Sequence, residues 1–149
     1  MPEWLLAAPR GGGDRAWLEM RIALWPDGSL AEHLAGMTET LARGHYVRLA
    51  LDAAGAALGF VEASKRSDYV NGTTSSPVAF LEGLYVVPAA RRGGVARALV
   101  ESVVTWALEQ GLRELASDSL IDNVAAHAAH RRLGFAETER VVYFRRPLP

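Results

Sequence analysis

Hydrophobic and polar positions follow two different periods along the chain, and together they predict strands interleaved with helices. Helices are predicted in four segments: Asp14 to about Leu24, Ser29 to Gly44, Gly93-Gly94 to about Gln110, and Asp122 to about Leu133. Apolar residues recur every three to four positions in the second and third segments, and only in part in the first. Short apolar runs predict strands at residues 3–8, 46–51, 57–64, 79–87, 113–117 and 135–146. This order predicts a mixed α/β domain rather than a helical bundle or a β-sandwich.

The apolar spacing also predicts which face of each longer helix is buried. The predicted stripes are Leu30, Leu34, Met37 and Leu41 in the second helix, and Val95, Leu99, Val103 and Trp106 or Ala107 in the third. Between the strands at 57–64 and 79–87 lies a long polar segment, residues 65–77. A loop of this length in a compact domain is often functional.

Length and composition narrow the class of protein. The 149 residues fit one domain, residues 1–149, and half of them are hydrophobic. With 16 basic and 17 acidic residues, no general attraction to nucleic acid or to an acidic membrane is expected. The lack of cysteine excludes disulfides, thiolate–zinc sites and cysteine nucleophiles. No secretion signal is recognisable and no apolar run reaches about 20 residues, so we expect a soluble cytoplasmic protein.

The segment from Val86 to Ala96 predicts an anion-binding turn. An apolar strand stops at Pro88, and glycines then open an amphipathic helix. The first N–H groups of a helix lack internal partners and suit a phosphate, and Gly94 permits close approach beside the charges of Arg91 and Arg92. The alternative is an ordinary turn with solvated arginines. Since neither G-x-G-x-x-G nor a P-loop lysine is present, a dinucleotide or nucleoside triphosphate is less favoured than another pyrophosphate.

The pattern R-x-x-G-x-A at Arg91, Gly94 and Ala96 resembles the coenzyme A signature of the GCN5-related N-acetyltransferases (GNAT). A second block, Asn123 with Ala126 and the later Leu133-Gly134-Phe135, is similar to the N-x-x-A…G-F pattern of that family's next helix. The resemblance implies a single-domain GNAT fold with a mixed central sheet, flanking helices, and acetyl-CoA as cosubstrate. It implies a cofactor site of Tyr85, Val86, Val87, Arg91, Arg92, Gly93, Gly94, Val95, Ala96, Asn123 and His130.

Further segments resemble one branch of that family, the aminoglycoside 6′-N-acetyltransferases. They are Leu24–Pro26, Asp68–Gly72, Ser75–Val78, Phe80–Gly83, Ala116–Asp118 and Glu137–Val141. The resemblance implies acetyl transfer to the 6′-amine of an aminoglycoside, which gives antibiotic resistance. It also implies direct attack of the neutral amine on the thioester, whose carbonyl is polarised by backbone N–H groups around Tyr85 to Val87. The lack of cysteine agrees with direct attack.

Glu82 is the first candidate for binding and deprotonating a cationic amine. It stands alone in the apolar run at residues 80–87, where a carboxylate is unfavourable unless it faces a cleft or has a partner. Alternation places its side chain on the face opposite Leu81 and Gly83. The alternative is a solvated glutamate at a sheet edge.

Four other residues complete the predicted substrate site. Asp118 ends the strand predicted at 113–117, beside the expected path of the cofactor arm, and is paired with Glu82 as the second candidate catalytic carboxylate. The resemblance makes Glu139 a further contact to a cationic substrate. Trp25 and Tyr69 are candidates for stacking on sugar rings. The alternatives are a turn cap at Asp118, a solvated charge at Glu139, and aromatic side chains that only pack.

The group that protonates the departing thiolate is left open. The resemblance gives Asn123 an amide contact to the coenzyme A arm, with a helix cap as the alternative role. Seven residues later many relatives have a tyrosine acid, whereas this chain has His130. His130, water or unassisted departure are the alternatives. His127 lies three residues before His130, but no third ligand is evident, so no metal is expected.

Two other functions stay open at this level. One is an acetyltransferase of a different amine, such as a polyamine or a protein N-terminus, although the acidic and aromatic candidates favour a small polycation. The other is a noncatalytic coenzyme A-binding module. The family that the chain resembles often forms dimers, and the apolar segment Val141–Phe144 is a candidate pairing edge, so a homodimer is expected.

Overall fold

Strands and helices follow the predicted order, apart from the last strand. A computed structural model describes residues 3–149. Its elements are β1 (Trp4–Ala7), α1 (Arg15–Leu24), α2 (Leu30–Ala42), β2 (Tyr46–Asp52), β3 (Ala57–Arg66), β4 (Val78–Val86), the 3₁₀ helix η1 (Pro88–Ala90), α3 (Val95–Glu109), β5 (Leu115–Ala116) and α4 (Val124–Arg132). The sheet order is β1-β2-β3-β4-β5, antiparallel except for the parallel pair β4–β5. The predicted α/β class with a mixed sheet is confirmed.

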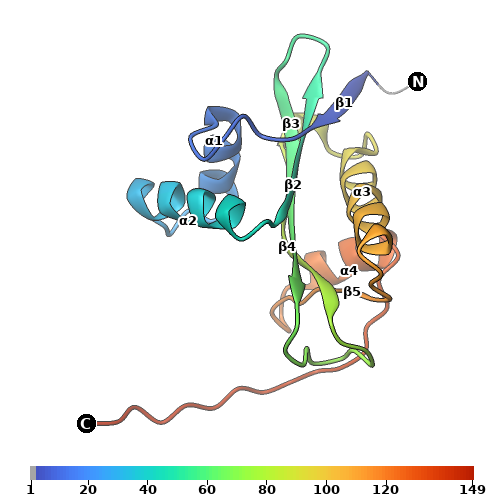
Figure 1. The fold of residues 1–149 in the computed structure, drawn as a ribbon. Helices are drawn as coiled ribbons and strands as arrows, with labels where there is room; N and C mark the ends of the chain where they lie inside the picture. The colour runs from blue at the N-terminus through green and yellow to red at the C-terminus, as the bar shows by residue number, and fades with distance from the viewer. Residues whose placement is uncertain (1–2) are drawn as a thin grey trace.

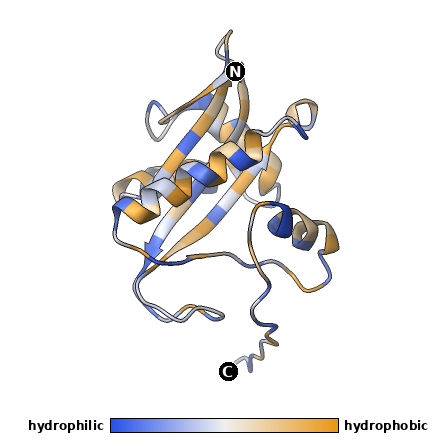
Figure 2. Ribbon diagram, turned by 90° about the vertical axis from the view of Figure 1, so that its right-hand side faces the viewer, coloured by the Kyte–Doolittle hydropathy of each residue, from blue (hydrophilic) through white to orange (hydrophobic). Residues whose placement is uncertain are grey.

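Helices cover both faces of this sheet (Figure 1). One core lies between the sheet and α1 with α2, and the other lies under α3, which crosses the sheet in the view of Figure 2. The first core is built from Trp17, Met20, Met37, Val47, Leu49 and Phe60, and the second from Ala50, Val61, Ala63, Leu81, Val95, Leu99 and Val103. The predicted stripe of α3 is therefore confirmed. No helix among residues 3–149 is both long and apolar enough to cross a membrane.

Helix starts follow local side-chain chemistry. The side chains of Asp14 and Ser29 each accept a hydrogen bond from the backbone N–H three residues on, so α1 and α2 begin where predicted. The prediction that Asp122 caps the last helix is wrong. The side chain of Asn123 accepts a hydrogen bond from the Ala126 N–H instead, and α4 begins directly after it.

The buried face of α2 differs from the predicted stripe. His33 and Met37 are buried, whereas Leu30 and Leu34 are exposed. His33 can be buried because its Nε2 lies 3.0 Å from the carbonyl oxygen of Trp25, to which it donates a hydrogen bond. α2 therefore buries a polar side chain whose hydrogen bond is made to the turn after α1. Apolar spacing alone could not predict that His33 is buried.

The predicted strand at 135–146 is wrong for a single copy of the chain. Residues 135–149 form no strand, and the segment runs away from the sheet as a tail (Figure 1). Glu137 pairs with Arg140 and Arg131 instead of joining a ladder, and the hydrogen bond from Arg140 is the main cause of the lowered pKa of Glu137. The side chains of Val142 and Phe144 are 74% and 92% exposed. The apolar side chains of the tail are thus not buried within one chain.

A buried ion pair joins α1 to the middle of the sheet. Glu62 on β3 is 3% exposed, and its carboxylate accepts hydrogen bonds from Arg21 at 2.5 and 2.7 Å and from the Trp17 indole at 3.0 Å. Burial raises the pKa of Glu62, and the attraction of Arg21 offsets this only in part. The Arg21 Nε is buried without a hydrogen-bond partner among the described residues. This pair fixes α1, and the turn that follows it, against β3.

Replacing Arg21 with Met should lower the free energy of unfolding by about 3–5 kcal/mol, because Glu62 becomes an uncompensated buried charge. The double variant Arg21→Met/Glu62→Leu should recover most of this loss. A pKa raised by folding means that stability is lost as the pH rises through the folded-state value. The single variant should therefore regain stability on acidification towards the ordinary glutamate range. Urea unfolding at several pH values measures both effects, and a double variant no more stable than Arg21→Met would contradict this account.

Candidate active site

The parallel strands β4 and β5 diverge after two residues and leave a wedge. Residues 79–80 of β4 pair with residues 115–116 of β5, and the same edge of β4 then continues to Val86 with no strand beside it in the described part of the chain. Backbone groups on an unpaired edge are available to a ligand. The wedge therefore is a place where an extended molecule can lie against β4.

One backbone donor near the end of β4 faces this wedge. The Val87 N–H donates to the Leu58 carbonyl of β3 at 2.9 Å, and N–H directions alternate along a strand. Tyr85 and Val87 therefore point their N–H groups at β3, and Val86 points its own into the wedge. Of the three residues predicted to hold the cofactor arm, Val86 has the available donor.

The turn from β4 to α3 has the backbone conformation of an anion site. Arg92 and Gly94 both adopt left-handed φ angles, of 67° and 89°. The first backbone acceptor of α3 is the Gly94 carbonyl, so the N–H groups of Val95 and the next two residues lack intrahelical partners. The Arg91 Nε donates to the Val86 carbonyl at 2.9 Å and closes the turn. Unpaired N–H groups, a glycine and two arginines fit the pyrophosphate of coenzyme A.

Glu82 occupies a β-bulge. The register pairs Glu62 with Gly83 but Ala63 with Leu81, so Glu82 is an extra residue of β4 with no counterpart on β3. A bulge locally twists a strand and re-aims a side chain. The bulge lies in the pairing of β4 with β3, and β4 borders the wedge on its other side.

The bulge breaks the alternation that the sequence predicts. Leu81 and Leu84 both pack with the core under α3. Gly83 faces the opposite side of the sheet. A Cβ atom at this position would lie 2.7 Å from the ring of Trp25, which directly follows α1. Glu82 and Gly83 thus share the α1 side of the sheet, and the predicted placement of Glu82 opposite Gly83 is wrong.

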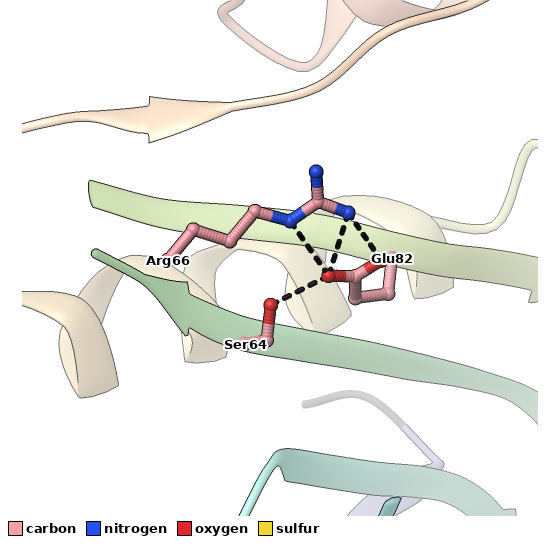
Figure 3. Close-up of polar contacts among 3 residues, drawn as sticks. All are labelled: Ser64, Arg66 and Glu82. Atoms are coloured by element: carbon pink, nitrogen blue, oxygen red, sulfur yellow. Dashed lines mark hydrogen bonds and ion pairs between the residues drawn. The ribbon is translucent and has the colours of Figure 1, made fainter. Parts of the chain in front are cut away.

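Both oxygens of the Glu82 carboxylate accept hydrogen bonds (Figure 3). Its Oε1 accepts hydrogen bonds from the Ser64 hydroxyl at 2.5 Å and from Arg66 Nε and Nη2 at 3.1 and 3.0 Å, and its Oε2 accepts one from Arg66 Nη2 at 2.9 Å. The guanidinium carbon of Arg66 also lies 3.5 Å from the centroid of the Phe80 ring. Glu82 is therefore a held, paired carboxylate, not a solvated one.

Trp25 and Glu82 line the same groove, of about 530 Å³. The Trp25 ring meets Phe60 edge-on at 6.1 Å and lies 4.8 Å from the guanidinium carbon of Arg21. The buried ion pair of Arg21 with Glu62 thus positions one wall of this groove. Trp25 is an anchored aromatic surface beside a carboxylate.

Tyr69, Asp118 and Glu139 line a second, larger hollow of about 890 Å³, bounded by the loop after β3, the end of β5, α4 and the tail. Arg66 lines both hollows. The structure thus groups Glu82 with Trp25, and Asp118 with Tyr69 and Glu139. It does not place the two predicted catalytic carboxylates in one hollow.

The loop that walls the larger hollow is clamped by Glu114. The carboxylate accepts hydrogen bonds from the Thr74 N–H at 2.9 Å and the Ser75 hydroxyl at 2.5 Å. These bonds lower the pKa of Glu114, and the hydrogen bond from the Ser75 side chain is the largest cause. The far end of the loop is therefore tied to the segment that leads into β5.

His130 is engaged through both ring nitrogens. Nδ1 lies 2.7 Å from the Ala126 carbonyl, which can only accept, so Nδ1 carries a proton. Nε2 lies 2.7 Å from the Ser117 hydroxyl, beside the end of β5. His130 thus reaches the wedge through Ser117. No group of three or more metal-ligating side chains occurs within residues 3–149.

Comparison with known proteins identifies the family. A model of the acetyltransferase (GNAT) family matches residues 14–135. The chain belongs to the GNAT family. This GNAT protein is 54% identical over 134 residues to an aminoglycoside N(6′)-acetyltransferase type 1 of Stenotrophomonas maltophilia, covering 89% of this chain and 86% of that one. It is 52% identical to a protein of the same name from Serratia marcescens, covering 89% and 92%.

Solved structures give the same picture of the GNAT fold. Aminoglycoside 6′-N-acetyltransferase AAC(6′)-Ih from Acinetobacter baumannii has a TM-score of 0.91 at 42% identity and covers 98% of this chain and 99% of its own. AAC(6′)-Iy in complex with the bisubstrate analogue CoA-S-monomethyl-acetylneamine has a TM-score of 0.90 at 39% identity, covering 99% and 100%. The fold expected from the resemblance is confirmed.

Sequence reasoning missed the partners of the candidate residues. Ser64 and Arg66 share a strand face by alternation, but only the cross-strand register and the bulge bring them to Glu82. A usable signal was present for the buried pair, since Glu62 stands in an apolar strand run as Glu82 does. A carboxylate in such a run predicts a partner, and Arg21 is that partner.

Gly94→Val should weaken coenzyme A binding by about tenfold or more, because a β-branched side chain strains the left-handed turn and stands where N–H groups meet the phosphates. Gly111→Val is the matched control, since Gly111 has φ 75° at the opposite end of α3 with open space around it. Calorimetry of coenzyme A binding compares the two. Equal affinities in both folded variants would contradict the turn as the phosphate site.

Proposed function

We propose that this protein transfers the acetyl group of acetyl-CoA to the 6′-amino group of aminoglycosides and so confers aminoglycoside resistance. Relatives that are 54% and 52% identical carry this activity in their names. The observation that carries the proposal is the arrangement along the free edge of β4. A turn suited to phosphates follows its end at Arg91–Gly94, and a carboxylate suited to an ammonium group stands at the bulge, Glu82.

On the cofactor side, the N–H groups at the start of α3 would bind the pyrophosphate, with Arg91, Arg92, Gly93, Gly94, Val95 and Ala96 forming the turn. The pantetheine arm would lie along the wedge with its thioester carbonyl at the N–H of Val86, and Tyr85 and Val87 would hold that edge in place through their bonds to β3. Asn123 and His130 would line the far side of the arm. Acetyl-CoA supplies an activated acetyl thioester.

On the substrate side, Glu82 and Trp25 would bind the ring that carries the reacting amine. The contacts that support this are the anchored indole and the carboxylate in one groove. Asp118, Glu139 and Tyr69 would bind the other rings and their ammonium groups in the larger hollow. A polycation could span the two hollows, since both include Arg66 among their lining residues.

The chemistry requires the bound ammonium group to lose two protons, one before and one after attack, and the sulfur to gain one. Glu82, directly or through water, would accept the first proton and so free the nitrogen to attack the carbonyl carbon. The second proton would pass to water as the carbon–sulfur bond breaks. The Val86 N–H would stabilise the developing oxyanion. His130 in its imidazolium form, with Nε2–H donating to the Ser117 hydroxyl and that hydroxyl to the sulfur, or water, would supply the proton to the leaving thiolate.

Glu82→Gln should lower kcat/KM for the aminoglycoside by about 100-fold or more, because it keeps the shape of the side chain but removes the base and its charge. The pH profile of kcat/KM should lose or shift its lower limb, whereas the KM for acetyl-CoA should change little. Steady-state assays against pH measure both. Glu101→Gln, the same change at an exposed position of α3, is the control. A wild-type pH profile in Glu82→Gln would exclude Glu82 as the base.

Asp118→Asn should also raise the aminoglycoside KM. Since Glu82 and Asp118 line different hollows, we expect the two changes to add in free energy, to within about 0.5 kcal/mol. Strong non-additivity would mean that both serve one amine. Failure of the wild-type protein to acetylate any aminoglycoside at the 6′-amine would refute the substrate and leave the acetyltransferase assignment.

We further propose one domain over residues 1–149, a cytoplasmic location and a homodimer. The family match covers residues 14–135, and residues 1 and 2 lie outside the described part. The location follows from the cytoplasmic supply of acetyl-CoA. The dimer is supported by the tail, whose apolar side chains Val142, Tyr143, Phe144 and Leu148 are exposed in one copy. Packing the tail on a second copy would bury them.

Val142→Asp/Phe144→Asp should convert the dimer to a monomer, because it places charges on the apolar tail. Leu108→Asp is the matched control, as Leu108 is 68% exposed on α3. Sedimentation equilibrium gives the mass of each variant. A wild-type monomer, or a tail variant that stays dimeric, would contradict the proposed interface.

A further inference from the structure

Arg66 stands where a cationic substrate is proposed to bind. A carboxylate has about four lone-pair sites. Glu82 accepts one hydrogen bond from Ser64 and three from Arg66, three of the four at Oε1 and one at Oε2 (Figure 3). Oε2 can accept one more donor, but an ammonium group there would lie beside the guanidinium charge, so repulsion between the two cations favours replacement of Arg66. A permanent positive charge in a site for polycations needs an explanation.

The position of Arg66 allows its guanidinium to separate from Glu82. Arg66 is the last residue of β3, its side chain is 43% exposed, and the side chain of Glu82 is 26% exposed. Because Arg66 also lines the larger hollow, its guanidinium can withdraw from Glu82 and stay near Asp68, Asp118 and Glu139. Ser64 would keep its hydrogen bond to Glu82 and hold the carboxylate in place. The ion pair is thus exchangeable, unlike the buried pair of Arg21 with Glu62.

We propose that Arg66 is the resident counter-ion of Glu82 and that its displacement weakens the binding of every amine, so that only amines with further contacts bind well. The reacting ammonium group must displace the guanidinium before it binds Glu82. A monoamine only exchanges one partly exposed ion pair for another, which gives little net affinity. A polycation gains further contacts in the larger hollow and so offsets the displacement. This inference rests on the proposed role of Glu82.

The kinetic test compares neamine, a polycation, with 6-amino-6-deoxyglucose, a monocation. Arg66→Met should lower the KM for neamine and raise kcat/KM for both amines, because each of them has to displace the same guanidinium. We expect a gain of about fivefold, which corresponds to a partly exposed ion pair, with little change in the ratio of the two kcat/KM values. Arg66→Lys keeps the charge without the planar fork and should lie between.

Lys65→Met is the matched control for long-range repulsion. Lys65 also lines the groove, and no hydrogen bond joins it to Glu82 among the described residues. Lys65→Met removes the same charge but leaves the bonds of Arg66 to Glu82 in place, so its gain in kcat/KM should be smaller than that of Arg66→Met. Equal effects of the two variants would overturn displacement in favour of general repulsion.

A second readout does not depend on turnover. In the ¹⁵N-arginine-labelled protein without acetyl-CoA, the Arg66 Nε–H signal, assigned by its loss in Arg66→Met, reports the hydrogen bond to Glu82. Saturating neamine should shift it to the position of a solvated arginine, and 6-amino-6-deoxyglucose at equal concentration should not. An unmoved signal with bound neamine would overturn the inference.

The outcomes separate this inference from the proposed function. If Glu82→Gln loses activity but Arg66→Met raises the neamine KM, Arg66 positions Glu82 or the substrate, and displacement is wrong while the function stands. If Glu82→Gln keeps wild-type kcat/KM, the proposed role of Glu82 fails and displacement fails with it. Acetyl transfer itself is tested by the wild-type assay alone.

Discussion

The candidate site depends on one constraint, the two-residue pairing of β4 with β5. Backbone N–H and C=O groups need partners, and a strand inside a sheet normally finds them on both sides. Here β4 keeps its bonds to β3 along its length but loses its other neighbour after Phe80. The unpaired edge faces a wedge between the anion-binding turn and the carboxylate of the bulge. A ligand that spans the wedge completes the hydrogen bonding of the sheet.

Two arginine–glutamate pairs on neighbouring strands show how burial divides structural from exchangeable interactions. Glu62 and Arg21 have side chains 4% and 11% exposed, so either partner alone would be a buried charge. Glu82 and Arg66 are several times more exposed, and water can solvate either of them after separation. The first pair fixes α1 and Trp25 against the sheet. The second pair is partly exposed at the end of β3, so separation of Arg66 from Glu82 leaves no buried charge. A carboxylate that is to bind a ligand must be able to exchange its partner in this way.

The sequence predicted the framework well because the framework is local. Caps at Asp14 and Ser29, the stop at Pro88 and the apolar stripe of α3 depend on residues within a few positions of one another. The periodic pattern gave wrong predictions where the burial or direction of a residue depends on partners far away in the sequence. His33 is buried because of Trp25, Glu82 leaves strict alternation because of a bulge, and residues 135–146 form no ladder because no strand of the same chain pairs with them.

The sequence predicts the chemistry of the candidate substrate residues but not how they are arranged. All five acidic and aromatic candidates line one of two hollows. Their division between the hollows depends on the path of the loop after β3 and on the tail. Neither path is encoded in a periodic pattern, and the partners of Glu82 come from the far end of another strand. The sequence pattern therefore lacks the cross-strand geometry that decides which candidate residues lie together.

The clamp of the loop by Glu114 has a consequence for how this protein can diversify. One end of the loop is continuous with β3, and the other is held by the bonds of Thr74 and Ser75 to a single carboxylate. Insertions and substitutions between those anchors, around Tyr69, would reshape the wall of the larger hollow without disturbing the sheet, the wedge or the anion-binding turn. Selection for a new amine can therefore act on one surface segment while the catalytic framework is inherited unchanged.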